Sequence, residues 1–184
     1  MGFKALVLLA DGAEEMEAVI AIDVMRRAEI SVTVAGLTSA GTVTCSRQVK
    51  IVPDADLATA IQNGPYDAIV MPGGLQGANA LAKAQSVKEI LLEQDKANRV
   101  IGAICAAPIA LKAHGIGFGK NITSYPSLKE RMEGYAYGEA CVVKDGNLIT
   151  SRGPGTAFEF ALSLVDAVCG KEIRDRVATP MLLE

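Results

Sequence analysis

The sequence predicts an α/β fold in which a mostly parallel central sheet is covered by helices on both faces. The first observation is a set of short, mostly apolar runs with little polar alternation, which is typical of parallel strands buried on both faces. They cover residues 3–10, 30–36, 68–71 and 100–104. The second observation is that longer segments with helical periodicity separate these runs, so strands and helices alternate. The third is a length of 184 residues without a repeat or linker, which predicts one domain over residues 1–184.

The first helix is predicted directly after the first strand. Gly12 and the acidic cluster at residues 14–17 open the segment, and Arg26-Arg27 closes it. Acidic residues at the start and basic residues at the end of a helix suit its dipole. Apolar side chains recur every four residues along it, at Met16, Ile20, Val24 and Ala28. This apolar surface is more than one sheet face needs, so we expect the helix to join a homodimer interface together with the edge at residues 45–47.

The remaining elements follow in order. Residues 43–45 and 49–52 flank a polar turn and predict a hairpin at the sheet edge, and residues 141–144 and 148–150 predict a second hairpin around Asp145-Gly146-Asn147. Helices are predicted at residues 57–62, 75–82, 87–97 and 157–169, the last ended by Gly170. Together these elements predict a flavodoxin-like three-layer sandwich.

Composition excludes several classes of function. The formal net charge is −3 and Lys and Arg are scattered, so we expect no direct DNA binding and no attraction to anionic membranes. The longest apolar run, residues 5–10, is too short to span a bilayer, and the first residues lack the pattern of a secretory signal. We therefore expect a cytoplasmic protein.

Cofactors and metals are also not expected. Four widely spaced cysteines and a single histidine cannot form a local zinc site, and we interpret the cysteines as reduced cytosolic thiols. No Gly-x-Gly-x-x-Gly or phosphate-loop pattern occurs, so NAD and ATP are not expected.

The candidate nucleophile is Cys105, directly after the strand at residues 100–104. Ligands in this kind of fold bind beyond the carboxyl ends of the strands. Small residues and Pro108 follow Cys105, which predicts a sharp turn from strand to helix like a nucleophile elbow. We expect the helix to start at Cys105, so that its free amides lower the pKa of the thiol. The alternative is that Cys105 is a buried cysteine that only fills space.

Two further groups reach the same sheet edge. Gly73 and Gly74 follow the strand at residues 68–71, and their amides could form an oxyanion hole, or the glycines could simply make the turn. Glu17 lies near the start of the first helix, where the alternative is a solvated acid that complements the dipole, the interpretation kept for Glu14 and Glu15. A buried Glu17 beside a thiolate would be protonated and would donate a hydrogen bond to the sulfur.

The single histidine does not complete a protease site. His114 lies near the far end of the helix that is predicted to start at Cys105, roughly 13 Å along its axis. At a helix C-terminus it is expected to be a dipole-stabilising surface residue. A Cys-His protease is therefore not expected.

Several stretches, in order along nearly the whole chain, resemble the ThiJ/PfpI superfamily. They are residues 12–17, 23–28, 32–37, 45–47, 71–74, 103–108 and 150–156. The resemblance implies a flavodoxin-like homodimer in which Cys105 is an oxidation-sensitive elbow cysteine and Glu17 is its hydrogen-bonded acidic neighbour. It also implies that the amides of Gly73, Gly74 and Ala106 face the pocket. Tyr125 stands where related proteins often carry a pocket histidine.

The resemblance further implies an oxidative-stress response protein whose Cys105 is oxidised to a sulfinate as a redox sensor. A slow, cofactor-free glyoxalase or protein deglycase activity on α-oxoaldehydes and their glycated adducts would use the same thiolate. The alternative is a redox-regulated chaperone or interaction protein without catalytic turnover. The resemblance adds the nucleus and mitochondria to the cytoplasm as expected locations.

Overall fold

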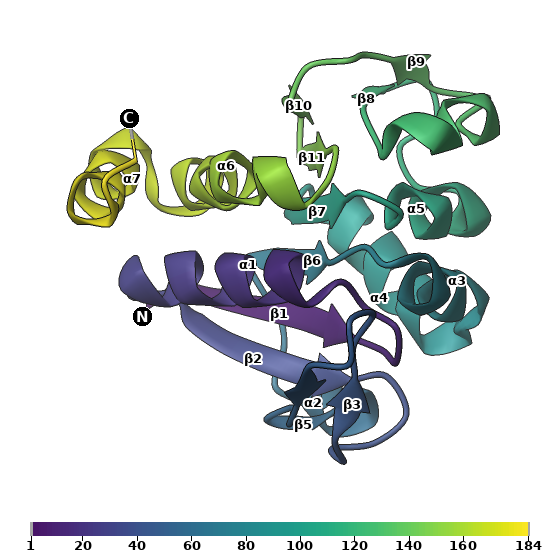
Figure 1. The fold of residues 1–184 in the computed structure, drawn as a ribbon, viewed down its shortest axis with the longest axis horizontal. Helices are drawn as coiled ribbons and strands as arrows, with labels where there is room; N and C mark the ends of the chain where they lie inside the picture. The colour runs from purple at the N-terminus through teal and green to yellow at the C-terminus, as the bar shows by residue number, and fades with distance from the viewer. Residues whose placement is uncertain (1, 184) are drawn as a thin grey trace.

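The computed structural model describes residues 2–183 and contains a seven-stranded sheet (Figure 1). Its strand order is β10-β11-β7-β6-β1-β2-β5, and every neighbouring pair is parallel except β10 with β11. The strands are β1 (Lys4–Leu9), β2 (Ser31–Gly36), β5 (Ala55–Asp56), β6 (Ala68–Met71), β7 (Val100–Ile104), β10 (Val142–Asp145) and β11 (Leu148–Ser151). The four predicted core strands are confirmed, as is the second hairpin.

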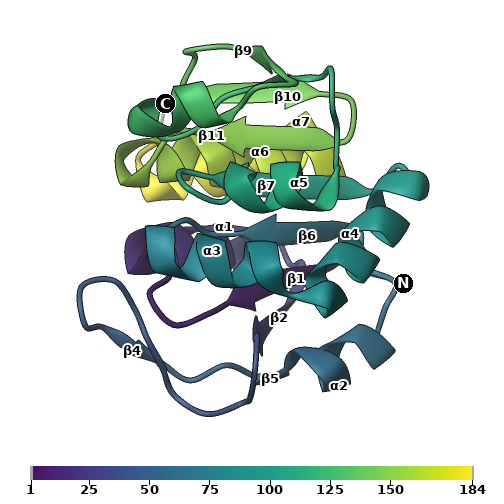
Figure 2. The same cartoon turned by 90° about the vertical axis from the view of Figure 1, so that its right-hand side faces the viewer.

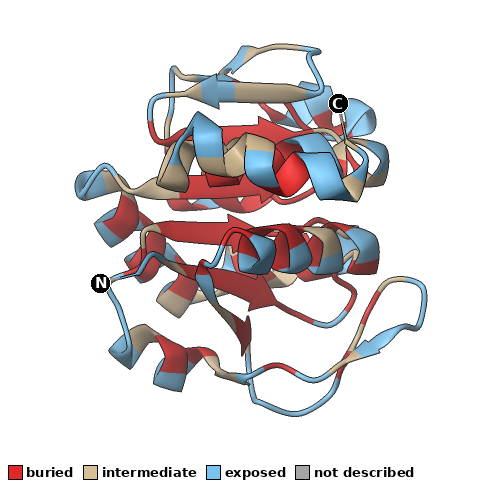
Figure 3. Cartoon of the chain, turned by 90° about the vertical axis from the view of Figure 1, so that its left-hand side faces the viewer, coloured by how far each residue is buried: buried red, intermediate tan, exposed pale blue. Residues whose placement is uncertain are grey.

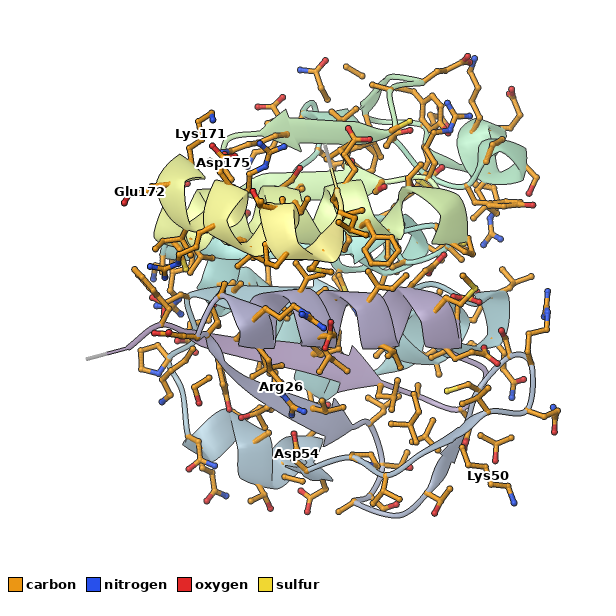
Figure 4. All side chains as sticks on the ribbon, turned by 60° about the vertical axis from the view of Figure 1, so that its left-hand side comes forward. Arg26, Lys50, Asp54, Lys171, Glu172 and Asp175 are labelled. Atoms are coloured by element: carbon orange, nitrogen blue, oxygen red, sulfur yellow. The ribbon has the colours of Figure 1, made fainter. Side chains whose placement is uncertain are left out.

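Helices cover both faces of this sheet. Figure 4 shows α1 (Glu15–Arg27), α6 (Ala157–Cys169) and α7 (Lys171–Ala178) in front of one face. Figure 2 shows the other face, which carries α2 (Leu57–Gln62), α3 (Leu75–Lys83), α4 (Gln85–Lys96) and α5 (Pro108–His114). Short 3₁₀ helices lie at Pro126–Arg131, Pro154–Thr156 and Thr179–Met181. The structure therefore confirms the flavodoxin-like three-layer sandwich.

The core consists of the apolar strands and the inner sides of the helices. All four residues of β6 and five of the six residues of β1 are buried, while the helices alternate between buried and exposed positions (Figure 3). Strands buried on both faces are what short, continuous apolar runs predict. Among the described residues, no helix is long and apolar enough to cross a membrane.

The first predicted hairpin forms, but it does not join the main sheet. Its strands, β3 (Val43–Thr44) and β4 (Lys50–Ile51), make a separate two-stranded sheet, and β5 takes the edge position beside β2. The reason is Asp54: its amide donates to the backbone oxygen of Val34 at 2.8 Å, and its carboxylate accepts from the Val34 amide at 2.8 Å. These two hydrogen bonds hold residue 54, which follows the hairpin, against β2. The segment that pairs with β2 is therefore β5 and not the hairpin.

Three other predictions need correction. Val24 was expected at a dimer surface, but it is fully buried against the core. Helix α7 was not predicted, because its charged sequence follows Gly170, a residue that commonly ends a helix. The short parallel pair β8 (Asn121–Ile122) and β9 (Ala136–Tyr137) was not predicted either, because two-residue strands carry no periodicity.

Candidate functional site

Cys105 lies at a strained turn directly after β7. Its φ is +62°, a left-handed conformation that residues other than glycine rarely adopt. The backbone is held on both sides, since the Cys105 amide donates to Ser151 O at 2.9 Å and the Tyr125 amide donates to Cys105 O at 2.8 Å. Helix α5 begins only at Pro108, so the prediction of a helix starting at Cys105 is wrong. The turn presents the thiol at the carboxyl edge of the sheet, as a nucleophile elbow does.

Glu17 approaches the thiol from the first turn of α1. The Glu17 side chain is 1% exposed, and its Oε2 accepts a hydrogen bond of 2.7 Å from the Gly73 amide. Burial raises the pKa of Glu17 to about 7, although hydrogen bonds with the Gly73 amide and the Cys105 side chain oppose this increase. Its other oxygen, Oε1, is buried without a hydrogen-bond partner. Near neutral pH, this carboxyl can therefore hold a proton that it shares with the sulfur.

The pKa of the Cys105 thiol is raised, whereas the sequence predicts that it is lowered. Burial and the negative charge of Glu17 raise the pKa of the thiol to about 12, while the amides of Gly74 and Ala106 act to lower it. The helix N-terminus that was expected to lower the pKa begins three residues later, at Pro108. The ionised form of Cys105 is thus disfavoured while Glu17 is also ionised. It forms more readily when the shared proton is on Glu17.

Two glycines let three backbone segments meet at the thiol. A Cβ on Gly73 would lie 2.6 Å from the Cys105 Cβ and 2.7 Å from Glu17 Oε2, closer than real contacts allow. Gly74 has a φ of +79°, and a Cβ there would lie 2.2 Å from Gly12 O. The roles of the glycine amides also differ from the prediction. The Gly73 amide is used by Glu17, and the Gly74 and Ala106 amides approach the sulfur.

His114 differs from the sequence-based expectation, and Tyr125 contributes its backbone to the site. Tyr125 joins the site through its backbone, while its side chain is 46% exposed and its ring lies beside Gly153. His114 was expected at the surface but is buried, with Nε2 2.9 Å from the carbonyl oxygen of Leu81. The histidine is thus engaged between α5 and α3, and the structure does not bring it to Cys105.

Sequence reasoning missed a second buried carboxylate, Glu15. It was interpreted as a solvated acid, but it is 6% exposed and accepts hydrogen bonds from Ser46 Oγ at 2.8 Å and from the Arg47 amide at 2.7 Å. Burial acts to raise the pKa of Glu15, but these hydrogen bonds and others from the backbone outweigh it and lower the pKa. No local pattern marks this contact, because Ser46 is 31 residues away along the chain.

Other sites are not evident in the described part of the chain. No group of three or more His, Cys, Asp or Glu side chains within residues 2–183 could hold a metal ion. Cys45, Cys105, Cys141 and Cys169 are free. The chemistry at this edge of the sheet therefore depends on one thiol, one carboxyl group and two backbone amides.

Comparison with known proteins identifies the family of this chain. The family model described as DJ-1/PfpI family matches residues 3–167. This chain belongs to the DJ-1/PfpI family. The family match spans both Glu17 and Cys105, so it includes the elbow and its acidic neighbour.

Individual relatives cover the full chain. The chain is 53% identical over 186 residues to the Parkinson disease protein 7 homolog of Danio rerio, covering 100% of this chain and 98% of that protein. It is 40% identical to a Caenorhabditis elegans protein named glutathione-independent glyoxalase DJR-1.2, covering 98% and 96% of the two chains. The crystal structure of Drosophila melanogaster DJ-1beta superposes with a TM-score of 0.97 at 50% identity and covers all of both chains.

Proposed function

We propose that Cys105 is both a peroxide sensor and the nucleophile of a slow, cofactor-free glyoxalase or protein deglycase. The observation that carries this proposal is the contact between the Cys105 thiol and Glu17, whose pKa is raised to about 7 by burial. Moving the proton from sulfur to Glu17 creates a thiolate beside a neutral acid. A neutral neighbour removes the charge repulsion that otherwise disfavours the thiolate.

In the sensing reaction, the thiolate attacks one oxygen of hydrogen peroxide, and the O–O bond breaks to give a sulfenic acid and hydroxide. A second peroxide oxidises the sulfenic acid to a sulfinic acid and leaves as water. The Gly74 and Ala106 amides already approach the sulfur and can donate hydrogen bonds to the new oxygens. Protonated Glu17 can also donate a hydrogen bond to one of these oxygens. These donors favour the sulfinate over further oxidation.

In the glyoxalase reaction, the thiolate adds to the aldehyde carbon of an α-oxoaldehyde, and the carbonyl oxygen takes the proton from Glu17. Glu17 then removes the proton from that carbon and returns it to the neighbouring carbon through an enediol, which converts the adduct to a thioester. Water hydrolyses the thioester to the 2-hydroxy acid and releases the thiolate. The oxidation of one carbon and the reduction of its neighbour balance, so no external oxidant is needed.

Turnover is expected to be slow. His114, the single histidine of the chain, is engaged at Leu81 O, so proton transfer depends on Glu17 and water. This favours the sensing role, and it keeps a redox-regulated chaperone or interaction protein as the second candidate. The name of the Caenorhabditis elegans relative favours glyoxalase activity.

Lactate formation from methylglyoxal by metal-free protein tests the catalytic part, and intact-mass analysis after peroxide treatment tests the sensing part. We expect lactate and an oxidised form heavier by about 32 Da, and we expect both to disappear in Cys105→Ser. Cys45→Ser is the matched control and should retain both. Peroxide oxidation at Cys105 without lactate would reject the enzyme and leave the sensor, whereas equal behaviour of Cys105→Ser and the parent would reject both.

We also infer that the protein is a homodimer that uses α1. The outer side of α1 exposes Met16 and Val19, and the neighbouring β4 region exposes Val49 and Val52. Between them lies a hollow of about 310 Å³, bordered by the ion pair of Arg26 with Asp54 (Figure 4). An exposed apolar surface of this kind commonly marks a protein interface.

Sedimentation at micromolar concentration tests the dimer. We expect about twice 19.2 kDa for the parent protein and 19.2 kDa for Val19→Glu. Leu92→Glu, an exposed leucine on the opposite face of the sheet, is the control and should remain dimeric. A monomeric parent would contradict the dimer, and a dimeric Val19→Glu would move the interface away from α1.

The four free cysteines favour a reducing compartment and thus the proposed cytoplasmic location.

A further inference from the structure

A cavity of about 260 Å³ lies at the opposite edge of the sheet from Cys105. It opens between α2 and α4, which cover the same face of the sheet (Figure 2). Leu6 of β1 and Ile69 of β6 line it from the sheet, and Ile61 and Ile90 line it from the helices. Arg99 at its mouth precedes β7 and Cys105 follows β7, so the two ends are separated by roughly 16 Å of strand. The cavity is therefore separate from the elbow site.

A buried amide fixes the guanidinium group at the mouth of this cavity. Gln94 is 1% exposed, and its Nε2 donates to the backbone oxygens of Tyr66 at 3.0 Å and Val100 at 3.1 Å. With its nitrogen held in this way, Gln94 Oε1 faces Arg99 and accepts from its Nε at 2.9 Å. The Arg99 side chain is 26% exposed and keeps its terminal nitrogens for other partners. Arg99 is thus preorganised before any ligand binds.

The present partner of Arg99 is replaceable. One terminal nitrogen of Arg99 lies 3.1 Å from Oε1 of Glu93, whose side chain is 72% exposed. Exposed ion pairs of this kind contribute little to stability because both charges remain well solvated when they separate. A second positive charge is nearby, since Lys4 Nζ lies 5.6 Å from the centroid of the Tyr66 ring that lines the cavity. The mouth therefore suits an anion, and the interior suits hydrocarbon.

We propose that this cavity binds a small monocarboxylate with an apolar body. The carboxylate replaces Glu93 and forms a bidentate pair with the terminal nitrogens of Arg99, a geometry that the guanidinium plane favours. The hydrocarbon body packs against Ile61, Ile69 and Ile90. The volume is just below the usual range for ligand sites, so the ligand has a short chain or a single ring.

Titration of hexanoate into the full-length, ¹⁵N-labelled protein tests this assignment by NMR. We expect saturable shifts at the Gln94 side-chain amide and the Arg99 Nε–H, and the same binding in Cys105→Ser. Hexanamide has the same body without the charge and should bind at least about tenfold more weakly. Equal affinity for hexanoate and hexanamide, or shifts confined to the elbow around Cys105, would overturn the proposal.

Two variants separate the carboxylate contact from general stability. Arg99→Gln should weaken hexanoate binding by about tenfold or more, while Glu93→Gln should strengthen it about threefold, because it removes the competing carboxylate. Glu93 is exposed, so its substitution should not disturb folding even if Arg99→Gln does. Unchanged or weaker binding in Glu93→Gln would contradict the exchange of carboxylates at Arg99.

Discussion

Cys105 and Cys45 are both buried cysteines with a glutamate from the start of α1 nearby, but the two glutamates differ in protonation. Glu17 lies beside Cys105 and its pKa is raised to about 7, whereas Glu15 lies near Cys45 and its pKa is lowered. The glutamates are two residues apart, so they point to different sides of the helix. Glu17 is buried with a single amide donor, and Glu15 faces two donors of the β3–β4 turn.

The two thiols therefore differ in whether the neighbouring glutamate can become neutral. Burial together with the charges of Glu15, Glu14 and Asp11 raises the pKa of Cys45 to about 11, and Glu15 stays ionised at neutral pH. Burial and the charge of Glu17 raise the pKa of Cys105 to about 12, but Glu17 can be neutralised by the thiol's own proton. We therefore expect a buried cysteine to be reactive when its acidic neighbour can accept a proton. Burial alone does not distinguish the two sites.

The largest expected effect is on the pH dependence of stability. A folded pKa of about 7 against an ordinary value of 4.5 means that the folded protein binds the Glu17 proton more tightly than the unfolded chain does. This contribution is fully present below pH 4.5 and is lost as the pH rises through 7, and it amounts to about 3 kcal/mol. Urea unfolding of the parent and Glu17→Gln from pH 4 to 8 measures it. The difference in unfolding free energy between the two proteins should change by that amount, and a constant difference would contradict the raised pKa.

The second prediction concerns thiol labelling. If Glu17 and Cys105 share one proton above pH 7, the thiolate fraction of Cys105 is nearly constant from pH 7 to 9, whereas that of Cys45 rises about tenfold per pH unit. The ratio of the iodoacetamide rates at Cys105 and Cys45 should therefore fall about 100-fold over this range. Site-resolved mass spectrometry gives both rates in one sample. Cys105 should be labelled first at pH 7, because it is the more exposed of the two, at 9% against 1%.

The control for this profile is Glu17→Gln, which cannot accept the proton. In that variant the labelling rate of Cys105 should rise about tenfold per pH unit, like that of an independent thiol. A pH-independent Cys105 rate in Glu17→Gln would assign the effect to another group, and faster labelling of Cys45 than Cys105 at pH 7 in the parent would reverse the comparison.

The third prediction tests the other glutamate. Glu15→Gln removes the negative charge that strengthens the hydrogen bonds from the Ser46 hydroxyl and the Arg47 amide, so we expect a loss of about 1–2 kcal/mol in unfolding free energy at pH 7. Amide hydrogen exchange should accelerate at residues 45–48 and stay unchanged at the elbow. Labelling of Cys45 should increase, because its charged neighbour is gone. Equal exchange in the parent and Glu15→Gln would show that the turn does not depend on this carboxylate.

The smallest expected effect concerns Tyr125. A phenol has an ordinary pKa near 10 and is a poor general base at pH 7, whereas imidazole titrates near neutrality. The Tyr125 side chain is 46% exposed, so Tyr125→His should raise methylglyoxal turnover about threefold to tenfold provided that the imidazole faces the pocket, and Tyr125→Phe should leave turnover unchanged. Steady-state kinetics with both variants and Cys105→Ser tests this. Fast turnover in the parent that neither variant alters would show that Glu17 and water transfer every proton.

Local sequence patterns are enough to predict the layers of the fold and the edge of the sheet at which the candidate site lies. Four apolar runs without polar alternation specify parallel strands buried on both faces, and the loops after β1, β6 and β7 must then meet at one edge. This is why the segments that carry Glu17, Gly73 and Cys105 could be placed at one edge from local patterns, whereas the pairing of Glu17 with Cys105 is what the family resemblance implies. The patterns depend on residues close in the chain, which a sequence shows directly.

The electrostatics of that edge depend on contacts that form when the chain folds. The start of α5 at Pro108, the use of the Gly73 amide by Glu17 and the contact of Glu15 with Ser46 join segments distant in the sequence or depend on exact turn geometry. A pKa depends on burial and on donors within a few ångströms, and neither is encoded in the spacing of residues along the chain. The sequence could therefore identify Cys105 and Glu17, but only their packing determines which of them holds the proton.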